Sequence, residues 1–267
     1  MRVSQRLDVH WICVWLLAGV GFFLPVSQAA PLRVVVDPGH GGKDHGTHRG
    51  TTFESHINLA VAKKLMEKLT ADSTFSATLT RDRDTTMTLS RRGKMAKEFK
   101  ADVLLSIHVN SSPDSRAKGA EFYFQNQLPP DEESLFLAHK ENSFEDMESE
   151  ALPYDFLEAN TYPNEVSFIV TDLLNSHRVW RSSQVAKYMK VKWRGTRKSQ
   201  VNSVRQAPFF LLSNLTVPST LVEIGYLTNS EDFRQLTDPG AQNRIAEDLY
   251  RGLRAYKESV DKKRSGF

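Results

Sequence analysis

Two patterns of apolar residues alternate along this chain. Continuous runs of aliphatic and β-branched residues cover positions 32–36, 102–108 and 219–226. Runs of this kind are typical of strands that are buried on both faces of a parallel sheet. Shorter runs at 78–81 and 119–125 predict two further strands. The sequence therefore predicts a sheet of at least five strands.

Between these runs, apolar residues recur at helical spacing. After Glu54 an apolar residue recurs at every fourth position, at Ile57, Val61, Leu65 and Leu69. This spacing predicts an amphipathic helix. A second helix is predicted over 88–99, and a C-terminal helix begins after Asp238-Pro239, a capping residue followed by proline. Strands and helices in alternation predict an α/β fold, a single domain whose central, largely parallel or mixed sheet is flanked by helices on both faces.

The N-terminal segment has the three parts of a secretory signal peptide. Two arginines precede an uncharged apolar run at 11–26, and small residues stand before a cleavage position after Ala29. A permanent membrane anchor is the alternative, but the run is shorter than the ~20 residues that a spanning helix needs. We therefore expect residues 1–29 to be removed, leaving a periplasmic domain, residues 30–267, without a membrane segment.

Charge and cysteine content narrow the choice of function. The chain has 267 residues with 35 lysines and arginines against 32 acidic residues, and the resulting charge of +3 is too small for a nucleic-acid-binding surface. Its single cysteine, Cys13, lies within the predicted signal peptide, so the mature chain forms neither a disulfide nor a thiolate metal site. Any metal must use nitrogen and oxygen ligands. We expect a monomer.

Histidines and an acid gather at one predicted sheet edge. His40 lies in the Asp-Pro-Gly-His-Gly-Gly turn after the first strand, and His108 ends the strand 102–108 at the same carboxyl edge. Two histidines and a carboxylate are a common catalytic zinc set, and Glu54 follows the His40 turn closely. Two alternatives remain. His40 would be a solvent-exposed side chain in a turn, and Glu54 would be an acid in the first turn of a helix, where the helix dipole stabilises it. A phosphate-binding loop is disfavoured because the required motif is absent.

A carboxylate also interrupts the apolar strand 219–226. Burying the ionised side chain of Glu223 is costly unless it is paired or near a metal, so the alternative is a solvent-facing edge position. A carboxylate beside a zinc-bound water can accept its proton and pass it to a leaving group. Glu223 is therefore the candidate general base and acid.

Several spaced motifs together resemble one known family. They occur in order over almost the whole mature chain: VVVDPGHGGKDHG, Glu54 with a following NLA, TLTRDRD, SIHVNSS, GAEFYF and PSTLVEIGYLTN. This set resembles the zinc-dependent N-acetylmuramoyl-L-alanine amidases of the type-3 class, which cleave peptidoglycan. The resemblance implies that His40, Glu54 and His108 bind Zn²⁺, that Glu223 is catalytic, and that Asn110 contacts substrate.

The implied reaction is hydrolysis of the amide between the lactyl group of N-acetylmuramic acid and L-alanine, in wall remodelling or daughter-cell separation. A zinc carboxypeptidase acting on wall peptides is a rival with the same fold, and an inactive wall-binding module is a rival of another class. The other histidines match no ligand position of the family and are expected at the surface or behind the ligands: His45, His48, His56, His139 and His177. The charged cluster 81–84 is expected to be structural.

The helical and strand patterns break between residues 126 and 180. This stretch is rich in acids, and Glu141, Glu145 and Glu148 are spaced to share one helical face. It is predicted to be an insertion, and family members under cell-division control have a helix here that covers the active site. One of these acids would then occupy the open zinc position until a periplasmic activator protein binds. The alternative is a solvated surface loop.

Overall fold

The structure is a computed structural model, and it describes residues 30–126, 129–143, 164–195 and 204–266. The predicted signal peptide lies outside these residues. The described chain forms one compact unit. None of its described helices is long and apolar enough to cross a membrane.

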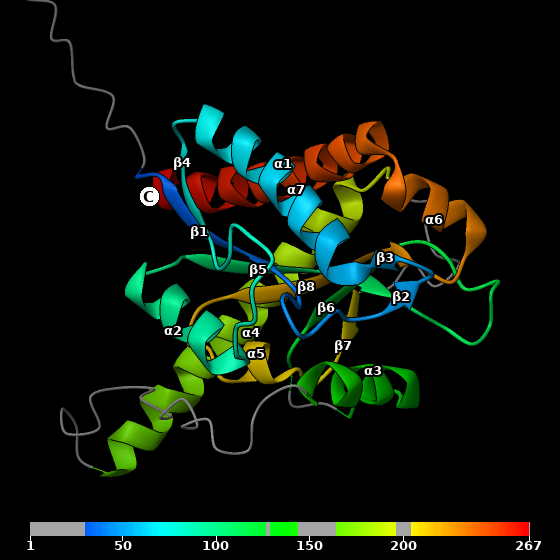
Figure 1. Cartoon of the computed structure of the whole chain (residues 1–267). Coiled ribbons are helices and arrows are strands. Elements are labelled where there is room, and N and C mark those ends of the chain that lie inside the picture. The colour runs from blue at the N-terminus through cyan, green and yellow to red at the C-terminus, as the bar shows by residue number, and fades with distance from the viewer. Residues whose placement is uncertain (1–29, 127–128, 144–163, 196–203, 267) are drawn as a thin grey trace, which may run out of the picture. The chain divides into compact units, whose positions relative to one another are not determined.

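A six-stranded mixed sheet is the centre of the fold (Figure 1). Its order is β4-β1-β5-β8-β6-β7, with the strands bounded as β1 Leu32–Pro38, β4 Phe75–Leu79, β5 Val103–Asn110, β6 Glu121–Phe124, β7 Val204–Gln206 and β8 Ser219–Tyr226. Strands β4, β1, β5 and β8 are parallel, whereas β6 runs antiparallel to β8. A small hairpin is formed by β2 (His48–Arg49) and β3 (Thr52–Phe53).

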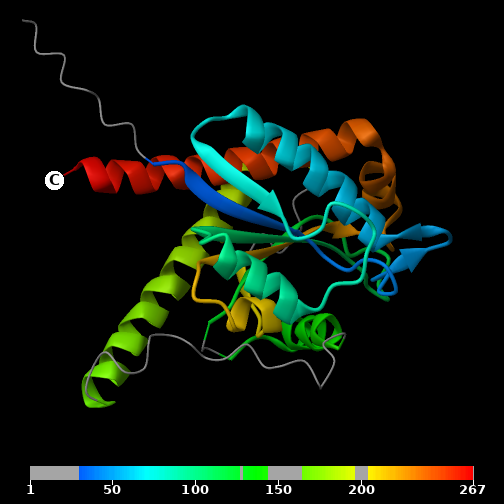
Figure 2. The same cartoon turned by 60° about the vertical axis from the view of Figure 1, so that its left-hand side comes forward.

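Helices cover both faces of this sheet, as Figures 1 and 2 show. The larger core lies between the sheet and α1 (Glu54–Ala71), α4 (Asn164–Lys192) and α7 (Pro239–Ser265). The opposite core lies under α2 (Leu89–Glu98), α3 (Glu132–Asn142) and α5 (Phe210–Ser213). A short helix, α6 (Ser230–Thr237), precedes α7. The predicted α/β fold with a mixed sheet is confirmed.

Alternating residues of β1 show why its apolar run is continuous. Val34 and Val36 pack into the larger core, and Val35 packs into the opposite one. Successive side chains of a strand point to opposite faces, so the middle of a strand that is covered on both sides is apolar at consecutive positions. The run in β1 therefore reflects its central place in the sheet.

Some elements differ from the prediction. The strand predicted at 78–81 is β4, which lies earlier, at Phe75–Leu79. β5 continues two residues past His108 to Asn110, with an irregular register between them. The acidic stretch 126–180 holds α3 and the first half of α4, helices that the apolar periodicity did not predict.

Candidate metal centre and active site

The predicted site residues meet at the carboxyl edge of the central strands. His40 follows β1, Glu54 is the first residue of α1, and His108 lies on β5 directly beside Glu223 of β8. All four side chains are buried, with exposed fractions between 0 and 7%. Parallel strands bring their carboxyl ends to one edge, which is where open α/β sheets bind ligands.

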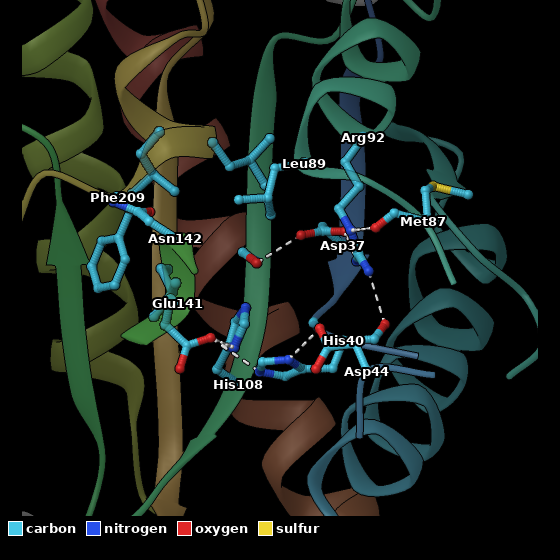
Figure 3. A pocket seen from close by; sticks show the side chains of 15 residues that line it. Asp37, His40, Asp44, Met87, Leu89, Arg92, His108, Glu141, Asn142 and Phe209 are labelled. Carbon is cyan, nitrogen blue, oxygen red and sulfur yellow. Dashed lines mark hydrogen bonds and ion pairs between the residues drawn. The ribbon is translucent and has the colours of Figure 1, made fainter. Parts of the chain in front are cut away.

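Three potential ligand atoms lie close together, and a fourth carboxylate approaches the two histidines. His40 Nε2 lies 3.2 Å from Glu54 Oε1, and His108 Nδ1 lies 3.2 Å from the same oxygen. Glu141 Oε2 lies 3.0 Å from His40 Nε2 and 3.1 Å from His108 Nδ1 (Figure 3). Zinc bonds of about 2.0–2.1 Å at tetrahedral angles place ligand atoms about 3.3 Å apart. The two 3.2 Å separations, and the presence of one ligand atom each from His40, Glu54 and His108 within 4.8 Å of one another, are compatible with a metal ion held by these three side chains.

Backbone geometry explains how His40 reaches this point. His40 has a φ of 59°, in the left-handed region that residues other than glycine rarely adopt. Its Nδ1 lies 2.8 Å from Asp44 Oδ2, which fixes the ring and leaves Nε2 to face Glu54. Gly39 is required beside it, because an added Cβ would lie 2.3 Å from His108 Cε1.

Glu54 is held by backbone amides on both sides of the cluster. Its Oε1 accepts a hydrogen bond from Val109 N at 2.9 Å, and its Oε2 accepts one from Thr47 N at 2.9 Å. Asn58 Nδ2, one helical turn later, also donates to Oε1 at 3.3 Å. These bonds stabilise an ionised carboxylate at a position that is completely buried.

The electrostatic field of the cluster favours positive charge. Burial disfavours the imidazolium of His40, but the carboxylates of Glu54, Asp44 and Glu141 outweigh it and raise the pKa of His40 well above its ordinary value. For His108, burial is again opposed by Glu141 and Glu54, which raise its pKa to about 9. A divalent cation would be stabilised here by the same carboxylates.

Glu223 lies on the other side of His108. One ligand atom from each of His108, Glu141 and Glu223 lies within 4.8 Å of the other two. Burial, opposed by His108 and reinforced by Glu54 and Glu141, raises the pKa of Glu223 well above its ordinary value. Neither carboxylate oxygen of Glu223 has a hydrogen-bond partner among the described residues. The side chain is thus suited to hold a proton.

Glu141 enters the cluster from α3, on the acidic stretch 126–180. Its side chain is 7% exposed, and Lys140 Nζ lies 3.6 Å from its other oxygen. The next residue, Asn142, donates to Pro208 O and accepts from Phe210 N, so the end of α3 is tied to the start of α5. Glu145 and Glu148, which were expected on the same face, lie outside the described residues.

Asn110 makes hydrogen bonds within the protein. Its Nδ2 donates to Glu121 Oε2 at 3.1 Å, and its Oδ1 accepts from Ser111 N at 2.7 Å. Glu121 also accepts from the hydroxyl groups of Tyr123 and Tyr226. Sequence reasoning missed Glu121, although it too is a carboxylate in an apolar strand. Substrate contact by Asn110 stays a prediction.

The remaining histidines are all exposed: His45, His48, His56, His139 and His177. Arg81, from the charged cluster 81–84, is 3% exposed and donates to backbone carbonyls, in agreement with a structural role. Asp44 was also missed, although it stands four residues after His40 in the same glycine-rich turn.

An α/β domain with buried histidines and carboxylates converging at its sheet edge has the construction of a metal-dependent hydrolase. The model of the N-acetylmuramoyl-L-alanine amidase family, Amidase_3, matches residues 34–255, and the chain belongs to this family. The resemblance found in the sequence motifs is thereby confirmed, and the family's members are amidases that act on peptidoglycan.

Individual relatives agree with this assignment. The chain is 29% identical over 231 residues to the probable amidase AmiB of Haemophilus influenzae, covering 85% of this chain and 52% of that protein. It is 29% identical over 225 residues to the amidase AmiA of Escherichia coli, covering 84% of this chain and 75% of the other. The chain thus spans about half of the first relative and three quarters of the second.

Solved structures of amidases have the same fold. The structure of the amidase AmiC2 of Nostoc punctiforme matches with a TM-score of 0.60 and 26% identity, covering 85% of this chain and 97% of that one. The catalytic domain of the amidase CwlV from Bacillus (Paenibacillus) polymyxa matches with a TM-score of 0.57 and 25% identity, covering 85% of this chain and 98% of that one.

Proposed function

We propose that this protein is a zinc-dependent amidase that hydrolyses the bond between the lactyl group of N-acetylmuramic acid and L-alanine of the stem peptide. The observation behind the proposal is the convergence of His40 Nε2, His108 Nδ1 and Glu54 Oε1 beside the buried carboxyl group of Glu223. A bound zinc ion supplies a Lewis acid that polarises the scissile carbonyl and activates water.

The protein's own groups provide positioning and proton transfer. Asp44 keeps the Nδ1 proton of His40 in place, so that Nε2 presents its lone pair to the metal. Glu223 takes a proton from the attacking water and delivers it to the amide nitrogen as the C–N bond breaks. The products are a free lactyl carboxylate and a stem peptide with a free amine on L-alanine. This balance needs one water and no other reactant.

Digestion of purified sacculi by the mature protein tests this reaction. Mass spectrometry should find peptides that begin with L-alanine and glycan chains that remain unbroken. Reducing muramic ends would indicate a glycosidase, release of single C-terminal amino acids would indicate the carboxypeptidase, and no product from zinc-loaded protein with α3 released would indicate the inactive module. Each of these results would refute the proposal.

We further propose that α3 inhibits the enzyme by occupying the open metal position. A catalytic zinc site keeps a fourth position for water, and Glu141 Oε2, which lies 3.0 and 3.1 Å from the two histidine nitrogens, would compete with water for that position. The N-terminal end of α3 is held by Arg205 of β7, whose guanidinium group lies 2.6 Å from Glu133 and 2.8 Å from Glu121. Its C-terminal end is held by Asn142.

Activation then requires a partner that binds the released form of α3 better than the closed form. With residues 1–29 as its signal peptide, the enzyme would be exported to the periplasm and would lie next to the cell wall. Inhibition would be needed there, because uncontrolled cutting of the wall lyses the cell. Deleting residues 131–160 and measuring dye release from labelled sacculi tests the inhibition. An unchanged rate in a folded, zinc-loaded deletion would exclude it.

A further inference from the structure

Two buried arginines lie directly behind the turn that presents His40. Arg81 stands just after β4 and Arg92 lies on α2, and they are 3% and 2% exposed. Buried guanidinium groups are costly unless their N–H groups are satisfied. Here each guanidinium group donates two hydrogen bonds to backbone carbonyls of one short segment, residues 38–40 (Figure 3 shows Arg92, Asp37 and His40).

The two side chains share the three carbonyls of this segment between them. Arg92 donates to Pro38 O at 2.7 Å and to His40 O at 2.8 Å. Arg81 donates to Pro38 O at 3.0 Å and to Gly39 O at 2.9 Å. Every backbone carbonyl from Pro38 to His40 therefore accepts a hydrogen bond from a buried arginine guanidinium group.

Two further contacts tie this unit to the rest of the site. Arg92 Nη1 pairs with Asp37 Oδ1 at 2.6 Å, so the sheet strand that leads into the turn holds the same guanidinium. Arg81 Nη2 also donates to Ser55 O at 2.9 Å, next to Glu54. The segments that provide His40 and Glu54 are thus fastened to one another through Arg81.

The backbone of His40 is strained, and strain needs such support. A residue other than glycine persists in the left-handed region only where the surrounding structure fixes it. His40 adopts this conformation two residues after β1 ends, and the direction of its ring follows from the backbone at that position. Without the guanidinium bonds the turn would relax toward ordinary φ values and displace the ring.

We propose that Arg81 and Arg92 are positioning residues that preform the metal site before any metal binds. The proposal rests on the proposed zinc function for its ligand, but the preformed turn is a property of the metal-free protein. Groups behind metal ligands typically change metal affinity by about 10- to 100-fold when they are replaced. A lysine at either position keeps the charge and loses the forked geometry.

The test compares Arg92→Lys and Arg81→Lys with Thr80→Val in the otherwise unchanged protein. Thr80 donates to Asp37 Oδ1 at 2.6 Å, in the same buried cluster, and its side chain does not bond the turn carbonyls. Zinc affinity is measured by competition with a chelator. We expect about 10- to 100-fold weaker zinc binding in the lysine variants, and less than about threefold change in Thr80→Val even if its melting temperature falls equally.

A second measurement needs no metal. The amides of Gly39 and Gly41 donate to Ile107 O and Asp44 O, so hydrogen exchange across residues 37–44 reports the turn directly. In metal-free wild-type protein these amides should be protected, and in the lysine variants they should exchange faster than in Thr80→Val.

Rapid exchange in the metal-free wild type would overturn the proposal, as would equal losses of zinc affinity in the lysine variants and Thr80→Val. Wild-type protein that bound no zinc would refute the proposed cofactor, and the exchange comparison would still decide whether the arginines preform the turn.

Discussion

Replacing Glu141 by glutamine should activate the enzyme. The substitution keeps the shape of the side chain but removes the charge that lies 3.0 and 3.1 Å from the two histidine nitrogens. A hydrogen bond to a charged group contributes about 1.5–3 kcal/mol, and each 1.4 kcal/mol is a factor of ten. The fraction of molecules with α3 released should therefore rise about 10- to 150-fold, until all molecules are open.

Initial rates of dye release from labelled sacculi measure this change, with zinc content determined on the same samples. Glu132→Gln is the matched control, because Glu132 lies on the same helix, is exposed and stands outside the ligand cluster. The control should leave the rate unchanged. A fall in the rate of zinc-loaded Glu141→Gln would make Glu141 a catalytic group instead, and an unchanged rate would remove α3 from the control of the site.

The other predictions concern the metal ligands, the proton transfer by Glu223, the ion pair that holds α3 in place and the export of the protein. His108→Ala should lose zinc and activity together, since three protein ligands leave no redundancy, and undiminished zinc by elemental analysis would contradict the site. Glu223→Gln should keep zinc but lose about 10²- to 10⁴-fold in turnover, whereas loss of zinc would make Glu223 a ligand. Glu133→Gln removes a partly exposed ion pair worth about 0.2–1 kcal/mol and should raise basal activity up to about fivefold above Glu132→Gln; equal rates would exclude this contact as a hold on α3. N-terminal sequencing of exported protein should begin at Ala30, and a sequence that begins at Met1 would support an anchor.

The sequence by itself determined those helices and strands whose local residue pattern is compatible with only one kind of secondary structure. Strand β8 and the start of α7 fall where the pattern placed them, because a strand covered on both faces is predominantly apolar and because Asp238-Pro239 combines a capping side chain with proline at the first helical position. The candidate ligands were found in two steps. Their positions around one predicted sheet edge made a metal site one alternative, and the resemblance to the amidase family implied the set His40, Glu54 and His108.

Tertiary structure decided how these residues meet and what covers them. Glu141 was one of three equivalent acids in the sequence, and only the packing of α3 against the sheet brings its oxygen to His40 and His108. Arg81 was expected only to be structural, and Arg92 was not singled out, because hydrogen bonds to backbone carbonyls leave no trace in a hydrophobic pattern. Long-range polar contacts depend on the path of the whole chain, so sequence periodicity, which is a local property, does not encode them.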